Sequence, residues 1–394
     1  STDGGETFKP LAVDLPGGEH AWTVDPWFVG KPLQIKVEVT DGVRSTAAVS
    51  ETFQVGGQPP SNGPRLVVVR NELPDGPVER DAPPPHRLYT MDPDGSNVAP
   101  FLHELDRSID AARWSPDGTR LAVSYRRREN DDPDTGVLVV DRDGSNLIRI
   151  SDPELNLRFV TCVQWHPDGS RLFAVGQAEH GDSRFYWLAA DGSGVEEIMN
   201  LGTGAMEHHG GTCPVLSPDG TKVTTTMLTN ESGYVYVIDL ATEEISRIYQ
   251  PPPGEVVIDA FWSPDGQDIW FHHARDYDHN ASVNTIDSIA ADGSSEPVVR
   301  FGVDAIRNDR DPRLIHDTSR MRFTPDGTRL LLTTPRWGII TSWWVNRAVC
   351  TVRPDGSDLQ CIWDPEGPRG MDGGGYHEAD LSVGDPWTPT LPPA

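Results

Sequence analysis

The chain has 394 residues and a formal net charge of −27, with 60 acidic against 33 basic side chains. Such a surface repels phosphate, so it excludes a nucleic-acid binder that relies on backbone contacts and argues equally against an anionic membrane surface. No apolar run approaches the roughly 18 residues of a membrane-spanning helix. We therefore expect no nucleic-acid partner and no membrane insertion.

Residues 1–57 have the alternating pattern of short β-strands, as in LQIKVEVTDGVRSTAAV. They resemble the latter part of an immunoglobulin-like or fibronectin type III-like module of secreted bacterial proteins. A complete module needs about 100 residues, so we expect a partial module here and a larger polypeptide or assembly around the chain. Residues 58–64, QPPSNGP, predict a linker between this module and the rest of the chain.

From residue 65 onward the chain repeats a five-residue motif that ends in Pro-Asp-Gly. The copies start 46–61 residues apart and read WSPDG (114–118), WHPDG (165–169), LSPDG (216–220), WSPDG (262–266) and FTPDG (323–327). Proline fixes φ and glycine tolerates positive φ, so each copy predicts a tight turn. A repeat of this length predicts a propeller or another repetitive architecture.

Each motif joins two β-rich runs, as in ARWSPDGTRLAVSY, and a second pair follows around an Asp-Gly-Ser turn, as in VLVVDRDGSNLIRI. Four antiparallel strands per repeat predict a propeller blade. Residues 65–105 supply three strands of a further blade, and YHEADLSVGDPW (376–387) supplies its missing strand. Pairing the two would close the ring and protect its edges.

We therefore expect an all-β fold. Residues 65–394 form a six-bladed propeller of four-stranded antiparallel blades, closed by N- and C-terminal strands in one blade, and a small β-sandwich-like piece precedes it. The repeat, represented best by ARWSPDGTRLAVSY, resembles the blades of the TolB-like propeller family over residues 65–394. This resemblance implies the fold and leaves the function open, because the family contains periplasmic scaffold proteins, peptidase propeller domains and polysaccharide lyases.

The four cysteines form two candidate pairs. Cys350 and Cys361 flank the turn at Asp355-Gly356 symmetrically, so a two-residue hairpin would place them opposite each other. Cys162 and Cys213 each stand three residues before a motif, at equivalent points of adjacent blades, where a bridge depends on the geometry. An even number of cysteines in such positions favours an oxidising compartment, so we expect an extracytoplasmic protein: secreted, periplasmic or at the cell surface.

Propeller topology sorts the loops onto two faces. Both kinds of turn emerge on one face, which we call the turn face. The connections between the second and third strands, and the crossovers between blades, emerge on the other, the loop face. Turn geometry explains the aspartates and glycines of the turn face, whereas the loop face holds most of the histidines and a large share of the arginines. A site is therefore expected on the loop face.

The residues seven positions before each motif would surround the mouth of the central channel on this face. The planar guanidinium of arginine can form two parallel hydrogen bonds to a carboxylate, and the flat indole ring of tryptophan can stack against a sugar. The expected ligand-binding residues are Arg107, Arg158, Glu255, Arg336, Trp337, Trp343 and Trp344. The candidate catalytic residues are His209, His273 and Tyr277.

A divalent cation is a second expectation for the channel mouth. His209, His316 and His377 could converge on zinc or manganese if the fold brings them together. The alternative is that they are solvated histidines at strand ends. Asp276, Asp278 and Asn280 alternate as calcium ligands do, although the glycine and terminal glutamate of an EF-hand are missing.

Two functions stay open. The favoured interpretation is a secreted or cell-surface recognition or scaffold propeller that binds a protein or a glycan through its loop face. The alternative is a metal-assisted lyase acting on an acidic saccharide, in which a base removes the proton α to a carboxylate that the cation neutralises. The second resembles the oligogalacturonate-lyase branch of the propeller lyases, with histidines holding a metal at the channel mouth, although the chain carries no copy of that branch's local motif.

Overall fold

A computed structural model defines the fold, and every regular element that it describes is a β-strand. The described residues are 32–40, 44–54, 65–71, 86–102, 105, 107–126, 135–150, 160–177, 182–203, 213–228, 231–275, 283–302, 319–337, 344–363 and 376–381.

The chain divides into two compact units, Ser1–Gly63 and Pro64–Ala394. The described part of the first unit is two antiparallel strand pairs: β1 (Pro32–Leu33) with β4 (Phe53–Gln54), and β2 (Lys36–Thr40) with β3 (Ser45–Val49). Two strand pairs are common to many β-folds, so the immunoglobulin-like or fibronectin III-like identity of this unit stays a prediction.

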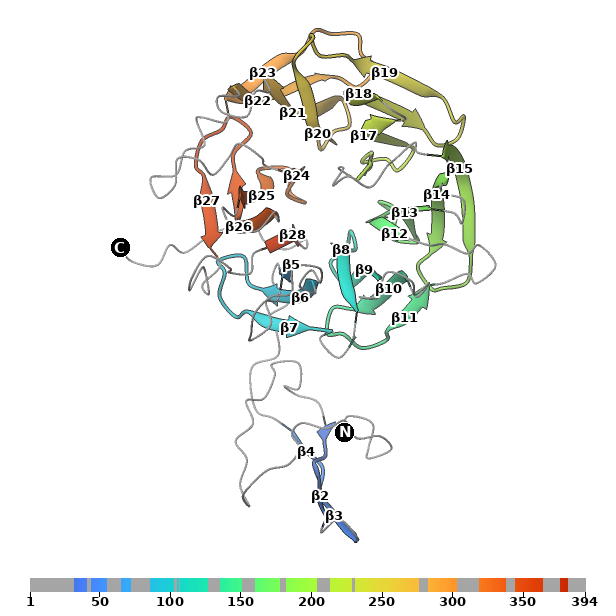
Figure 1. Ribbon diagram of the computed structural model, residues 1–394, viewed down its shortest axis with the longest axis vertical. Coiled ribbons are helices and arrows are strands. Elements are labelled where there is room, and N and C mark those ends of the chain that lie inside the picture. The colour runs from blue at the N-terminus through green and yellow to red at the C-terminus, as the bar shows by residue number, and fades with distance from the viewer. Residues whose placement is uncertain are drawn as a thin grey trace. The chain divides into compact units, whose positions relative to one another are not determined.

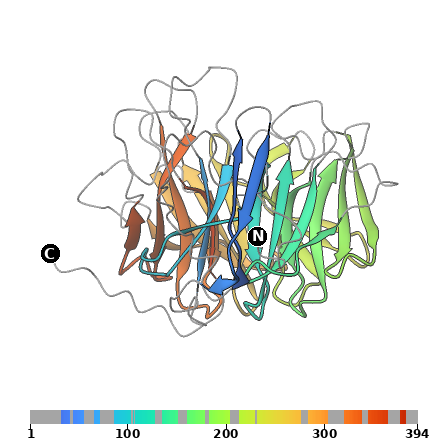
Figure 2. The ribbon, with the colours of Figure 1, turned by 90° about the horizontal axis from the view of Figure 1, so that it is seen from below.

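The second unit is a six-bladed propeller of four-stranded antiparallel sheets, as predicted. Figure 1 looks through the ring, with strands such as β8, β12 and β20 at its centre and β11, β15 and β19 at its outside. Figure 2 shows the blades edge-on, their strands running from one face of the ring to the other.

The first three blades, from the inner to the outer strand, are blade 1 (β28 Tyr376–Leu381, β5 Leu66–Asn71, β6 His86–Met91, β7 Ala99–Phe101), blade 2 (β8 Ser108–Trp114, β9 Arg120–Arg126, β10 Gly136–Asp141, β11 Ile148–Ile150) and blade 3 (β12 Val160–Trp165, β13 Arg171–Gln177, β14 Asp182–Ala189, β15 Val195–Thr203). The others are blade 4 (β16 Val215–Leu216, β17 Lys222–Leu228, β18 Glu231–Asp239, β19 Ile245–Tyr249), blade 5 (β20 Val256–Trp262, β21 Asp268–Arg275, β22 Val283–Ala290, β23 Val298–Gly302) and blade 6 (β24 Ser319–Phe323, β25 Leu330–Trp337, β26 Trp344–Val352, β27 Gln360–Trp363).

Blade 1 is built from both ends of the unit, which confirms the predicted closure. Strand β28 pairs antiparallel with β5, and Leu381 lies opposite Leu66. The inner strand of this blade is thereby supplied by the C-terminal part of the chain. The ring is held shut by backbone hydrogen bonds, which leave no open edge between its first and last strands.

The hydrophobic core lies between neighbouring blades. Between blades 4 and 5, Val235 and Val237 of β18 pack with Ile269 and Phe271 of β21. Each sheet has a neighbour on both of its faces, so both sides of its middle strands can be buried. Strand β10 is an example, with every residue from Gly136 to Val140 buried.

Candidate functional site

The two kinds of turn share one face of the ring, as the topology requires. In blades 2 to 5, the turn between the third and fourth strands donates a hydrogen bond to the turn between the first and second strands. Examples run from the Arg142 nitrogen to the Thr119 oxygen at 2.8 Å and from the Leu240 nitrogen to the Thr221 oxygen at 3.0 Å. These contacts fix the turn face, and the connections between the second and third strands emerge on the opposite, loop face.

The turn-face aspartates are occupied within their own turns. Asp117 accepts hydrogen bonds from the Ser115 hydroxyl at 2.6 Å and the Thr119 nitrogen at 3.0 Å. The bond from Ser115 is the main cause that lowers the pKa of Asp117, and the equivalent serines lower the pKa of Asp219 and Asp265. Much of the acidic charge on this face therefore stabilises turns.

On the loop face, three of the predicted site residues have described side chains: Arg107, Glu255 and His273. Arg107 stands directly before β8, and Glu255 stands directly before β20, so the two hold equivalent positions at the starts of their inner strands. The carbonyl of Arg107 accepts a hydrogen bond from the guanidinium of Arg87 at 3.4 Å. Arg107 and Glu255 belong to different blades, and no contact joins the two in the described structure.

The other predicted residues lie outside what the structure describes. This holds for the whole of Arg158, His209, Tyr277, His316 and Trp343, and for the calcium-like group Asp276, Asp278 and Asn280. Only strand positions are described for four more: Arg336 and Trp337 in β25, Trp344 in β26 and His377 in β28. Among the described residues, no group of three or more His, Cys, Asp or Glu side chains is arranged to hold a metal ion. The predicted metal site thus stays a prediction.

The structure brings His273 between two carboxylates. Its Nδ1 hydrogen-bonds Asp287 Oδ2 at 2.9 Å, and its Nε2 lies 2.8 Å from Glu255 Oε2. The side chains of His273 and Asp287 are 2% and 0% exposed, whereas that of Glu255 is 24% exposed. The result is a short chain of polar groups that begins inside blade 5 and ends at a carboxylate on the loop face.

Strand geometry explains this convergence. His273 on β21 points toward blade 4, where the ring of Tyr249 packs edge-on against the imidazole at a centroid distance of 5.7 Å. Asp287 lies on β22, whose residue 285 is paired with His273, so the carboxylate projects from the same side of the sheet two residues along. Glu255 reaches the imidazole from the start of β20, the inner strand of the blade.

Electrostatics defines what the group can do. The imidazole of His273 hydrogen-bonds Asp287 through Nδ1, whereas its Nε2 faces the Glu255 carboxylate at ion-pair distance without hydrogen-bond geometry. Because Asp287 and His273 are buried, they hold the partly exposed carboxylate of Glu255 in one orientation, which suits it for accepting hydrogen bonds from a ligand.

The sequence patterns point to Glu255 and His273 but not to Asp287. The available signal was a single carboxylate in the otherwise uncharged strand VNTIDSIA. Such a residue is rarely buried without a partner.

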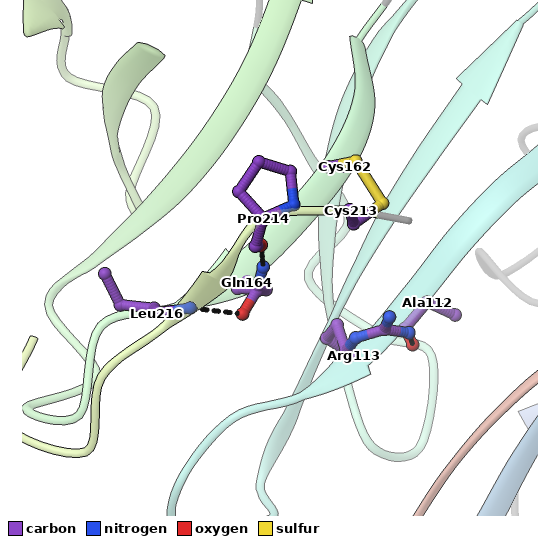
Figure 3. Close-up of a disulfide and its surroundings, with 7 residues drawn as sticks. All are labelled: Ala112, Arg113, Cys162, Gln164, Cys213, Pro214 and Leu216. Atoms are coloured by element: carbon purple, nitrogen blue, oxygen red, sulfur yellow. Dashed lines mark hydrogen bonds between the residues drawn. A yellow bond between two sulfur atoms is a disulfide. The ribbon is translucent and has the colours of Figure 1, made fainter. Parts of the chain in front are cut away.

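A second polar arrangement links the inner strands around the channel. Asp380 of blade 1 accepts a hydrogen bond from the Trp114 nitrogen of blade 2 at 2.8 Å, and Asp259 of blade 5 accepts one from the Met321 nitrogen of blade 6 at 2.9 Å. Gln164 of blade 3 does the same for the Leu216 nitrogen of blade 4 at 3.0 Å (Figure 3). These side chains join neighbouring blades where no backbone ladder connects them.

Both predicted disulfides are present. Cys350 and Cys361 are paired directly across β26 and β27, with their Cα atoms 4.1 Å apart, as the symmetric hairpin predicts. Cys162 and Cys213 join blades 3 and 4 with their Cα atoms 5.6 Å apart (Figure 3).

The described residues contain no helix that is long and apolar enough to cross a membrane.

No protein-family model and no curated protein matches the chain. Among solved structures, it is similar to TolB from Acinetobacter baumannii, with 17% identity, a TM-score of 0.55, and coverage of 81% of this chain and 66% of that one. It is also similar to a protein described as TolB from Agrobacterium tumefaciens, with 16% identity, coverage of 77% and 90%, and a TM-score of 0.47. An oligogalacturonate lyase in complex with manganese has 13% identity, coverage of 70% of each chain and a TM-score of 0.48.

At these identities the likeness concerns the fold alone, and the chain spans just under two thirds of the Acinetobacter protein's length. The six four-stranded blades, closed by strands from both ends of the unit, give this protein the architecture of a TolB-like six-bladed propeller.

Proposed function

We propose that the protein is an extracytoplasmic recognition propeller that binds a protein or glycan partner through its loop face. The observation that carries this proposal is the group of Glu255, His273 and Asp287. It places a carboxylate of fixed orientation at the start of an inner strand, next to the channel, and supports it from within the core.

The contrast with the turn face supports the choice of surface. The aspartates there accept hydrogen bonds from the serine, threonine and backbone groups of their own turns, so their presence is accounted for by the fold. The Glu255 carboxylate instead lies 2.8 Å from the buried imidazole of His273. Its two buried supporting groups cost desolvation free energy, and a fixed position for the carboxylate is what this arrangement gains in return.

The chemistry of Glu255 defines the kind of group that it would bind. A carboxylate held by an imidazole accepts hydrogen bonds from an ammonium, a guanidinium or the hydroxyls of a saccharide. A propeller suits this role because its rigid blades hold side chains at fixed distances around the channel mouth.

The two disulfides support an oxidising compartment for this function. Structural disulfides persist in secreted and periplasmic proteins and are rare in reducing ones. Both cysteine pairs of the chain are joined, and none of the four cysteines is left free.

The proposal is tested by probing immobilised glycan and peptide libraries with the oxidised protein, and by then measuring the affinity of each hit for two variants. Glu255→Gln keeps the shape and removes the charge, and it should weaken binding by about tenfold, the effect of one charge-assisted hydrogen bond. Glu244→Gln, at an exposed position of a turn in blade 4, is the matched control and should bind like the parent. Ligands that are indifferent to Glu255 and sensitive to turn-face substitutions would overturn the proposal.

A further inference from the structure

The inner strand of blade 4 is the shortest in the ring. Strand β16 covers only Val215 and Leu216, and it pairs with β17 at two positions. The inner strands of the neighbouring blades, β12 and β20, pair with their second strands at five and six positions. The backbone ladder that fixes the other inner strands is therefore largely missing here.

Contacts from both neighbouring blades hold this short strand. The Gln164 amide of blade 3 donates a hydrogen bond to the Pro214 oxygen and accepts one from the Leu216 nitrogen, as Figure 3 shows. From blade 5, the indole of Trp262 donates to the Val215 oxygen at 2.9 Å. The covalent contact is the disulfide from Cys213, two residues before β16, to Cys162 on β12.

The second disulfide makes a natural comparison. Cys350 and Cys361 face each other within one sheet, in a ladder that also pairs Val349 with Ile362 and Thr351 with Gln360. Opening this bond would leave the pairing of β26 and β27 in place. The bond between Cys162 and Cys213, in contrast, spans two blades and closes a separation of 51 residues. Of the two disulfides, it is the one that crosses a blade boundary.

We propose that the Cys162–Cys213 disulfide is a redox-sensitive clip that fastens the inner strand of blade 4 to blade 3. Its opening would release β16 while the other blades stay folded. Cys213 is half-buried and Cys162 is buried, so Cys213 is the more accessible of the two residues to an attacking thiolate. Besides the disulfide, β16 is held by hydrogen bonds, by two ladder positions and by the packing of Val215 and Leu216 against the neighbouring core clusters. These local contacts open at a lower free energy than the whole ring.

The chemistry is thiol–disulfide exchange with a dithiol reductant. One thiolate of the reductant attacks Cys213 Sγ, the bond between the two cysteines breaks, and the sulfur of Cys162 leaves as a thiolate that takes up a proton. The second thiolate of the reductant then attacks the mixed disulfide and releases Cys213. Two electrons and two protons pass to the protein, which gains two thiols, and the dithiol becomes a disulfide.

Hydrogen exchange followed by mass spectrometry tests the clip without any ligand, so its outcome is independent of the proposed function. The oxidised protein is compared with the Cys162→Ser/Cys213→Ser variant, and Cys350→Ser/Cys361→Ser is the matched control. Exchange in peptides that cover residues 213–223 should rise by about tenfold or more in the first variant, with blades 1, 5 and 6 unchanged. The control should show no change in those peptides.

Where the serine variant does not accumulate as folded protein, the folded oxidised protein is treated with tris(2-carboxyethyl)phosphine, and alkylation reports which bond has opened. Unchanged exchange at residues 213–223 after opening of the bond would overturn the proposal. So would a simultaneous rise in every blade, because the disulfide would then hold the ring as a whole.

Discussion

Gly356 of blade 6 packs directly against Phe301 of blade 5, so closely that a Cβ atom on the glycine would lie 2.9 Å from the Phe301 Cβ. Gly356 also has a φ of +80°, in the left-handed region that side chains disfavour. The same relationship recurs at Gly293, whose added Cβ would lie 3.3 Å from the Ile248 Cβ of blade 4. At these positions, the glycine of the turn between the third and fourth strands is thus a packing residue between blades as well as a turn residue.

Gly356→Ala should destabilise the propeller by about 2–4 kcal/mol, because the methyl group strains the left-handed backbone and collides with the β-carbon of Phe301. Thermal or denaturant unfolding measures the loss. Gly194, in the corresponding turn of blade 3, has open space around an added Cβ, so Gly194→Ala is the control and should change stability by less than about 1 kcal/mol. Equal effects at the two positions would contradict the packing role.

Two buried tryptophans of the repeat differ in one hydrogen bond. Trp165 donates from its indole to the Arg113 oxygen at 2.9 Å, whereas the Trp114 indole nitrogen has no hydrogen-bond partner among the described residues. Trp165→Phe should therefore cost about 1–3 kcal/mol more than Trp114→Phe, since it leaves a buried carbonyl without its donor. Both substitutions remove the same volume, so the difference between the two losses in unfolding free energy reports the hydrogen bond. A difference near zero would contradict the prediction.

The ion pair of Asp358 with Arg329 predicts a dependence of stability on pH. The guanidinium lies 2.7 Å from the carboxylate, and its hydrogen bond is the main cause that lowers the pKa of Asp358 from 3.8 to about 2. Because the pKa is lower in the folded state, the pair stabilises the fold at pH values above about 4, and this contribution is lost as the pH falls toward about 2.

Asp358→Asn should consequently lower the unfolding midpoint at neutral pH, and its difference from the parent should shrink between about pH 4 and pH 2. Asparagine tolerates the positive φ of 55° at this position, so the backbone is not strained by the change. In Arg329→Lys, an NMR titration should show the pKa of Asp358 rising. The pKa of Asp168, which the backbone of Ser170 holds at about 2, should stay in place. A difference that is independent of pH would exclude the ion pair as its source.

The expected metal site is tested by titrating manganese or zinc into protein that has been treated with a chelator. If His209, His316 and His377 bind one cation, the unfolding temperature should rise with metal concentration, and His209→Ala/His316→Ala should abolish the rise. His166→Ala, on the turn face, is the control and should keep it. An assay for unsaturated products on pectic substrates, run with the loaded protein, then examines the lyase alternative, and a flat absorbance trace would count against it.

The architecture could be predicted because turn chemistry is local. The Pro-Asp-Gly and Asp-Gly-Ser motifs mark the ends of strands wherever they occur, and their spacing gives the number of blades. The pairing of Cys350 with Cys361 followed from the same logic, since a hairpin turn sets the register of its two strands. Even the closing strand around Leu381 could be assigned, because one blade lacked an inner strand and the C-terminal region supplied one.

The candidate site depended on contacts that local patterns do not contain. Glu255, His273 and Asp287 stand 14 to 32 positions apart on different strands, and only their lateral pairing and their common side of the sheet bring them together. The attachment of β16 to its neighbouring blades by Gln164, Trp262 and a disulfide is of the same kind. The sequence thus determined where strands begin and end, because turns depend on a few adjacent residues. The tertiary structure decided which side chains meet, because burial and inter-blade register depend on segments far apart along the chain.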